Sequence, residues 1–403
     1  MKARFTVFLL FVVILGGCSL FGGEETPVAQ EQPTNTPQRR STSTPFGPEP
    51  SPTTASATDT PTPAPTATVV ISRHGPDNFP ENVSPLTGLV VENQALLERR
   101  PLAVKITLMP RSSRPQWGLS LADIVFEYYQ NGGISRFHTI FLSNDSEMAG
   151  PIRSARFPDE ALIRMHKSIF AFGSADFRVL NRFRFADFSP YLVNEYPAGC
   201  PPMCRYEPTT HNHLVTNTPE LSEYISNQGL ENGRQNLNGM LFDSLVPTGG
   251  QPGTVANTRF GPQIYHRWEY DPTTGAYLRN QDVQDDLGGA GEEYGPLIDQ
   301  MTDEQITAAN VVVLLVPHDY FSRSPEIIEM NLAGSGDAFA FRDGQVYQVR
   351  WNVPAQDSVL YLTNPDGSLF PYKPGKTWYT IIGTSSLQSQ PEDGTWRFEF
   401  RIP

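Results

Sequence analysis

The stretch from residue 24 to about residue 70 limits most strongly what this chain can fold into. It is rich in Ser, Thr and Pro and is nearly devoid of apolar side chains. Such a segment cannot bury enough apolar surface to offset the conformational entropy that folding removes. Proline-rich chains favour the extended polyproline II conformation. We therefore predict a disordered, semi-stiff tether over residues 19–75 and a folded part that begins near residue 76.

The first eighteen residues have the features of an export signal. Lys2 and Arg4 precede an apolar run over residues 5–15, which is too short to span a bilayer as a helix. The Leu-Gly-Gly-Cys sequence that ends at Cys18 is typical of a bacterial lipobox. This pattern predicts a signal peptide over residues 1–18 and an extracytoplasmic protein anchored to the membrane by a lipid on Cys18. The alternative is an ordinary signal peptide that contains a cysteine.

The length and the net charge of the chain limit how many domains it can contain and which kinds of partner it can bind. The chain has 403 residues and a formal net charge of −13. Phosphate binding needs clustered Lys and Arg, so the acidic balance argues against a nucleic-acid partner. The length that remains after the tether suggests two domains. We predict a mixed α/β domain over residues 76–239 and a β-rich domain over residues 240–403.

The first of these domains alternates strands with helices. Turn residues over 131–135 predict a hairpin between the second and third strands. Thr218 is the expected N-cap of the last helix, with Pro219 at the first helical position. The expected strands cover residues 102–107, 124–130, 136–143 and 169–175, and the expected helices cover residues 92–101, 157–169, 175–183 and 217–229.

The second domain has the alternation and the turn signals of a β-rich structure. Residues 265–281 alternate across a turn, and residues 311–317 form an apolar run typical of a core strand. Asp343 and Gly344 separate two alternating runs, which is the strongest short-range signal of a hairpin. The residues therefore predict an α/β part followed by a mostly β part.

Five segments occur in an order that resembles one known family. They are SPLTGLVV (84–91), RPLAVKI (100–106), RPQWGLSLADIVFEYYQNGGISRF (114–137), GPIRSAR (150–156) and GSGDAFAFRDGQVYQVRW (334–351). From about residue 80 onward the chain resembles the YerB family (DUF3048), a group of bacterial lipoproteins of unknown function. The resemblance implies an α/β (α+β) fold with layered mixed sheets and helices on one side. It implies no catalytic residue and no substrate.

Two cysteines lie outside the lipobox, Cys200 and Cys204. Outside the cytosol, such a close pair predicts a small disulfide loop. One alternative is a zinc site with His211 and His213, although zinc sites of this kind usually have a longer gap between the Cys pair and the His pair. Two free thiols are the other alternative. We expect no metal and no other cofactor.

Two carboxylates and three arginines are the main candidates for a binding site. Asp123 and Glu127 are four residues apart on an expected strand, which places both on one face. Buried carboxylates need partners, and Arg136, Arg153 and Arg156 are nearby candidates because the planar guanidinium binds carboxylate in a bidentate way. In one interpretation these arginines hold the fold together. In the other they face a groove and bind an anionic group of the cell envelope, helped by the backbone at the start of the next helix.

His211 and Asn212 lie in a Thr-His-Asn-His stretch that adds a second candidate region. The family that the chain resembles has Pro before His-Asn, whereas this chain has Thr210. Our preferred hypothesis is a binding module for a cell-wall polymer or envelope protein, with a cleft lined by the three arginines and this loop. The competing hypothesis is a hydrolase of envelope material that uses Asp123 or Glu127 with His211.

Overall fold

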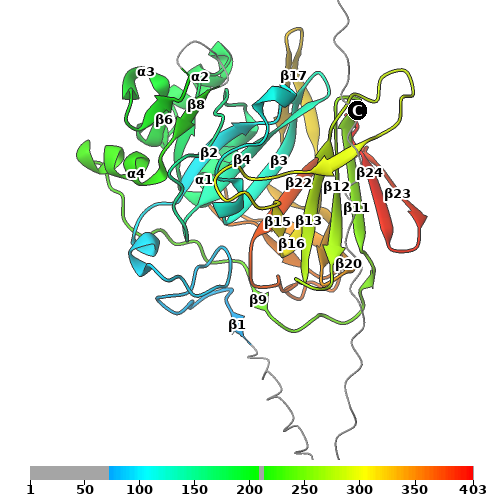
Figure 1. Cartoon of the computed structure of the whole chain (residues 1–403). Helices are drawn as coiled ribbons and strands as arrows, with labels where there is room; N and C mark the ends of the chain where they lie inside the picture. The colour runs from blue at the N-terminus through cyan, green and yellow to red at the C-terminus, as the bar shows by residue number, and fades with distance from the viewer. Residues whose placement is uncertain (1–71, 208–212, 403) are drawn as a thin grey trace, which may run out of the picture. The chain divides into compact units, whose positions relative to one another are not determined.

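A large mixed β-sheet runs through the part of the protein that the computed structural model describes, residues 72–207 and 213–402 (Figure 1). Its central strand β3 is flanked on one side by strands from the first half of the chain and on the other side by strands from the second half. In spatial order the strands are β10 (Gln251–Pro252), β20 (Gln345–Val353), β19 (Gly334–Arg342), β16 (Asn310–Val316), β22 (Thr377–Gly383), β3 (Ile124–Asn131), β4 (Ile134–Phe141), β2 (Leu102–Thr107), β5 (Ile169–Phe172) and β6 (Leu192–Asn194), with β21 (Tyr361–Thr363) paired to β20.

The two halves of the chain meet at strand β22. This strand pairs in parallel with β3 on one side and with β16 on the other. Every residue of β16 and of β22 is buried, as expected of strands that are covered on both faces. Residues on both sides of the predicted boundary near residue 240 therefore share one sheet, and the described residues all belong to one compact unit.

A second, seven-stranded sheet packs against the first through aromatic side chains. Trp268 of this sheet lies 5.2 Å from Trp378 of β22, and Tyr277 lies 6.3 Å from Phe341 of β19, measured between ring centroids. Trp268 and Tyr277 are fully buried. One part of the core thus lies between the two sheets, and the helices contribute further buried residues such as Leu162 and Phe183. The second sheet has the order β14 (Tyr294–Pro296), β13 (Ala276–Asp282), β12 (Ile264–Asp271), β11 (Val255–Gly261), β24 (Thr395–Glu399) and β23 (Leu387–Glu392), with β15 (Thr307–Ala308) paired to β13.

The helices belong to the first half of the described chain. They are α1 (Pro158–His166), α2 (Phe177–Arg184), α3 (Glu195–Ala198) and α4 (Thr218–Asn227). Figure 1 shows α2, α3 and α4 gathered at the end of the large sheet that carries β2 and β6. Three two-stranded pairs complete the fold: β1 (Arg73–His74) with β9 (Phe242–Asp243), β7 (Met203–Arg205) with β8 (Leu214–Thr216), and β17 (His318–Arg323) with β18 (Glu326–Met330).

This arrangement confirms the predicted fold class, a layered α+β structure with a β-rich C-terminal part. The hairpin predicted at Asp343 and Gly344 joins β19 to β20, and both residues have positive φ, as the turn requires. The helix expected over residues 92–101 is instead a 3₁₀ helix, Gln94–Glu98. Within the described residues, no helix is long and apolar enough to cross a bilayer.

The predicted N-cap of α4 is wrong by one residue. Asn217 has the extended backbone of a cap, and its side chain accepts a hydrogen bond from the backbone N–H of Glu220 at 3.1 Å. Thr218 is the first helical residue, and its hydroxyl is engaged elsewhere. It donates to the Asp145 carboxylate at 2.8 Å and accepts from the backbone N–H of Ser146 at 2.8 Å.

Candidate functional site

Glu127 lies in the middle of β3 and is completely buried between the two sheets. Its carboxylate pairs with Arg279 of β13 at 2.9 Å and lies 3.4 Å from His266 of β12. Ser135 also donates to it at 2.8 Å, and the indole of Trp378 donates at 3.3 Å. Burial alone would raise the pKa of Glu127, but Arg279 and His266 outweigh burial and hold this pKa well below its usual range. Glu127 is thus an ionised group sealed inside the core.

Asp123 immediately precedes β3 and has different surroundings. One carboxylate oxygen, Oδ2, accepts hydrogen bonds from the backbone N–H groups of Leu142 and Ser143 at 2.6 and 2.9 Å. Burial raises the pKa of Asp123, while Ser143, Leu142 and Lys376 act in the opposite direction. The predicted salt bridges between these carboxylates and Arg153 or Arg156 are therefore wrong for Glu127, whose partner Arg279 comes from the other sheet.

The hydrolase hypothesis loses its support at these two positions. Glu127 is 0% exposed and ionised by a fixed cation, so it cannot approach a substrate. Asp123 is held by backbone N–H groups. His211 and Asn212, the other members of the predicted site, lie outside the described residues. The histidine that Glu127 does meet, His266, is itself fully buried, so among the described residues no open pocket joins Asp123 or Glu127 to a histidine.

Two of the predicted arginines converge on the backbone of the turn that precedes α1. The Nη1 atom of Arg136 donates to the carbonyl oxygen of Ser154 at 2.6 Å. The Nη1 atom of Arg156 donates to the carbonyl oxygens of Ala155 at 2.9 Å and of Ser154 at 3.4 Å. Both side chains are partly buried. Among the described residues, neither guanidinium forms an ion pair with a carboxylate. Their hydrogen-bond partners are backbone carbonyls, and the buried Asp159 carboxylate stabilises both charges from farther away.

Arg153 adds a third positive charge to this group, which we call the arginine cluster (Arg136, Arg153 and Arg156). Burial lowers the pKa of Arg136 to about 9, and the charges of Arg156 and Arg153 act in the same direction. Burial also lowers the pKa of Arg153 and of Arg156. The charges of Arg153 and Arg156 therefore destabilise the charged form of Arg136, whereas Asp159 and Asp176 stabilise that of Arg156.

A buried polar network lies directly behind the arginine cluster, and the sequence analysis missed it. The Asp159 carboxylate of α1 accepts hydrogen bonds from Lys105 of β2 at 3.1 Å and from Tyr128 of β3 at 2.5 Å, and it contacts Nδ1 of His138 of β4 at 2.8 Å. All four side chains are fully buried. The available signal was a charged side chain inside an apolar strand, since Lys105 follows Leu-Ala-Val and lies opposite His138 in the sheet.

The charge of this network does not balance that of the arginine cluster. Burial and the charges of Arg136 and Arg156 together lower the pKa of Lys105 to about 7, although Asp159 acts in the opposite direction. Two carboxylates, Asp159 and Asp176, thus act on the three cations Lys105, Arg136 and Arg156. These three cations outnumber the two carboxylates in an otherwise acidic protein.

The predicted disulfide includes Cys204, which precedes Arg205, a residue whose charge acts on Arg153 of the arginine cluster. Cys200 and Cys204 are bonded, with their Cα atoms 4.7 Å apart. Both sulfur atoms are consumed by this bond, so they are not available as ligands for the zinc site that we considered. His213 lies 3.1 Å from the Glu207 carboxylate and packs against the ring of Tyr206.

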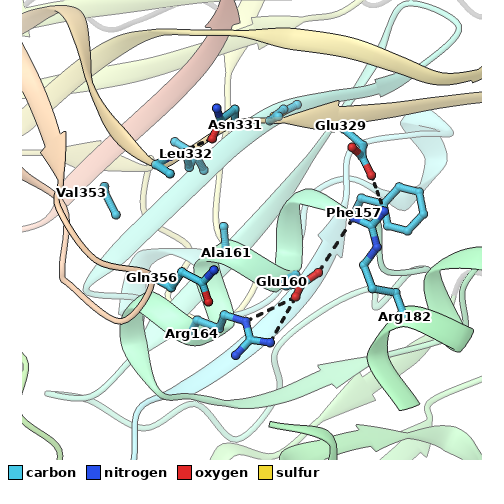
Figure 2. Close-up of a pocket in the computed structure, with 12 residues that line it drawn as sticks. Phe157, Glu160, Ala161, Arg164, Arg182, Glu329, Asn331, Leu332, Val353 and Gln356 are labelled. Carbon is cyan, nitrogen blue, oxygen red and sulfur yellow. Dashed lines mark hydrogen bonds and ion pairs between the residues drawn. The ribbon is translucent and has the colours of Figure 1, made fainter. Parts of the chain in front are cut away.

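A separate cavity of about 190 Å³ lies beside α1 (Figure 2). Figure 2 shows Glu160 between Arg164 and Arg182, with Arg182 reaching Glu329. The ring of Phe157 lies 3.8 Å from the guanidinium carbon of Arg182. Two cations and two carboxylates neutralise one another here, so this cavity offers a ligand no unbalanced charge.

Comparison with known proteins gives one consistent result. Residues 86–231 match the family described as "Protein of unknown function (DUF3048) N-terminal domain", and residues 256–379 match the corresponding C-terminal domain. A Bacillus subtilis (strain 168) protein named "Putative lipoprotein YerB" is 27% identical over 327 residues, which are 76% of this chain and 88% of that protein. The crystal structure of the YerB protein from Bacillus subtilis superposes with a TM-score of 0.63 at 25% identity, covering 74% of this chain and 96% of that chain. The predicted resemblance is thereby confirmed, and the chain belongs to the YerB-like DUF3048 family.

Proposed function

We propose that this protein is an extracytoplasmic lipoprotein, anchored through Cys18, that binds an anionic group of the cell envelope at the arginine cluster. The name of its Bacillus subtilis relative supports the lipoprotein part of the proposal. The signal and lipobox over residues 1–18 support it independently, although they lie outside the described residues.

The observation that carries the binding proposal is the way Arg136 and Arg156 are held. An arginine that only stabilises a fold normally meets a carboxylate, as Arg279 and Arg397 do in this protein. Arg136 and Arg156 instead donate to the carbonyl oxygens of Ser154 and Ala155. Carbonyl groups fix the direction of a guanidinium but carry no full negative charge to pair with it, and Asp159 is shared with Lys105. A bound anion would supply the missing charge.

The buried network gives the cluster its rigidity. The second Asp159 oxygen accepts a hydrogen bond from the backbone N–H of Arg156 at 2.7 Å. The backbone of Arg153 is fixed as well, because its N–H donates to the carbonyl oxygen of Lys105 and its own carbonyl accepts from Gly173. A site whose cations are held before the ligand arrives loses little conformational entropy on binding.

The test is a binding measurement on the full chain, purified in detergent, with anionic cell-wall fragments and with inorganic phosphate as a simple probe. We expect the double variant Arg136→Gln/Arg156→Gln to bind at least about 10-fold more weakly than the wild type, since a hydrogen bond to a charged group contributes about 1.5–3 kcal/mol. Raising the salt concentration weakens binding to the wild type.

The control variant is Arg350→Gln. Arg350 is exposed and already paired with Asp337 at 2.9 Å, so the same chemical change removes a charge that is not available to a ligand. Its affinity for the fragments should equal that of the wild type. Equal binding by the double variant and the wild type, with both folded by circular dichroism, would defeat the proposal.

A further inference from the structure

A second cavity, of about 480 Å³, lies at the opposite end of β3 from the arginine cluster. Asp123 is at this end, whereas Arg136 lies opposite Tyr128 in the sheet. Five residues of extended strand separate the two places, or about 16 Å. A ligand in this cavity would therefore be independent of the function proposed for the arginine cluster.

The floor of this cavity contains polar atoms that lack partners. Asp123 is 1% exposed, and its second carboxylate oxygen, Oδ1, has no hydrogen-bond partner among the described residues. The hydroxyl of Ser143, which also lines the cavity, is buried and lies close enough to Asp123 to lower its pKa, but it forms no hydrogen bond of good geometry in the described part of the chain. A buried acceptor without a donor costs about 1–3 kcal/mol, so such atoms are uncommon unless something else binds them.

Lys376 lines the same cavity and supplies the opposite charge. Its ammonium group donates to the carbonyl oxygen of Ser120 and stabilises the ionised form of Asp123 through its charge. The two side chains do not form a direct ion pair. Burial lowers the pKa of Lys376, and Asp123 acts against that change. A carboxylate and an ammonium thus face one cavity without meeting.

Part of the wall of the cavity is apolar, while Glu92, Asn93 and Asn144 add polar side chains. Leu89 and Val90 are 47% and 65% exposed, which is unusual for two consecutive large apolar residues, and Leu96 lies beside them. Apolar walls with a few convergent polar groups are the usual composition of a small-molecule site. At the rim, the Asp145 carboxylate is already paired with Arg99 at 2.7 Å and does not compete for a ligand.

We propose that this cavity binds an α-amino acid with an apolar side chain. The ammonium group of the ligand would donate to Oδ1 of Asp123 and to the Ser143 hydroxyl, and its carboxylate would accept from Lys376. The apolar side chain would cover Leu89, Val90 and Leu96. Each unpartnered group in the cavity then meets a group of complementary charge, and the exposed apolar wall is removed from water.

A ligand series on the unmodified full chain tests this proposal by isothermal titration calorimetry. L-leucine and D-leucine are the probes; N-acetyl-leucine lacks the ammonium, and leucinamide lacks the carboxylate. We expect one leucine enantiomer to bind, and both analogues to bind at least about 10-fold more weakly, because each loses one charge-assisted contact. Absence of binding by both enantiomers up to about 10 mM, or equal binding by leucine and its two analogues, overturns the proposal.

Two variants assign the binding to this cavity. Lys376→Met should weaken leucine binding at least about 10-fold and leave leucinamide binding unchanged, because leucinamide has no carboxylate for Lys376 to contact. Asp337→Asn removes an exposed carboxylate elsewhere and should change nothing. Leucine binding that is unaffected by Lys376→Met would place the ligand at another site and contradict the proposal. Binding of wall fragments at the arginine cluster should be the same in both variants, so the two proposals fail separately.

Discussion

The buried ion pair between Glu127 and Arg279 joins the two sheets at the scale of single residues. Both side chains are fully buried, so each charge depends on the other for compensation. Removing one partner of such a pair leaves an unpaired charge in the core, which costs about 3–5 kcal/mol. We expect Glu127→Gln to lower the free energy of unfolding by about this amount, as measured by urea denaturation.

Two further variants distinguish the cost of an unpaired buried charge from the effect of changing a carboxylate to an amide. Glu269→Gln breaks an exposed ion pair with Arg267 and should change stability by less than about 1 kcal/mol. Adding Arg279→Met to Glu127→Gln should restore part of the lost stability, because no charge then remains unpaired. If the Glu127→Gln protein is as stable as the Glu269→Gln protein, the Glu127–Arg279 pair does not make the predicted contribution to the free energy of unfolding.

Residue types could be predicted here, but their partners could not. The sequence analysis grouped Asp123 and Glu127 with the three arginines because these residues are close along the chain. In the structure, Glu127 finds Arg279 on a strand of the other sheet, and Asp123 finds backbone N–H groups. Alternation along a strand indicates which side chains face inward, but it contains no information about which distant strand will pack against them.

At the scale of elements, strand β22 is the part on which the large sheet most depends. It supplies the parallel partner of β3, and its removal would leave Ile124, Val125 and Phe126 along an open edge. We expect a fragment of residues 72–239, expressed alone, to aggregate or to unfold without a cooperative transition. Co-expression with residues 240–403 should restore solubility. A soluble fragment with a cooperative thermal transition would contradict this expectation.

Local pairings were predictable from the sequence, and distant pairings were not. The turns at residues 131–135 and at Asp343 and Gly344 were correct because turn residues act on their immediate neighbours. Nothing in β22 or β3 specifies that the two pair with each other, since a parallel partner is chosen by packing over the whole sheet. For the same reason, the division into two domains, residues 76–239 and 240–403, remains a prediction from the sequence.

For the molecule as a whole, acid should weaken the fold well before its carboxylates titrate. Burial lowers the pKa of His166 to about 3 and that of His318 to about 4. Below pH 6.5 these two histidines bind protons in the unfolded chain but stay neutral in the folded protein. The free energy of unfolding therefore falls as the pH falls. Each histidine contributes up to about 1.4 kcal/mol per pH unit.

A carboxylate extends the same trend to lower pH. Burial alone would raise the pKa of Glu292, but Arg397, Tyr294 and Arg259 outweigh burial and lower it to about 2. Its stabilising effect is complete above about pH 4.5 and is lost between pH 4.5 and 2. Thermal unfolding between pH 7.5 and 4 measures the histidine part. We expect His318→Leu to show a shallower decline than the wild type, and parallel curves would contradict the assignment.

The position of β22 also determines when the protein can acquire its structure. The middle of the large sheet cannot form until residue 383 has left the ribosome, because β3 pairs with β22, which is synthesised some 250 residues later. A polypeptide that remains unfolded during its synthesis can pass through a narrow export channel. For the extracytoplasmic lipoprotein proposed above, the late synthesis of one strand would keep the chain in a state fit for export, and the large sheet would be completed only after export.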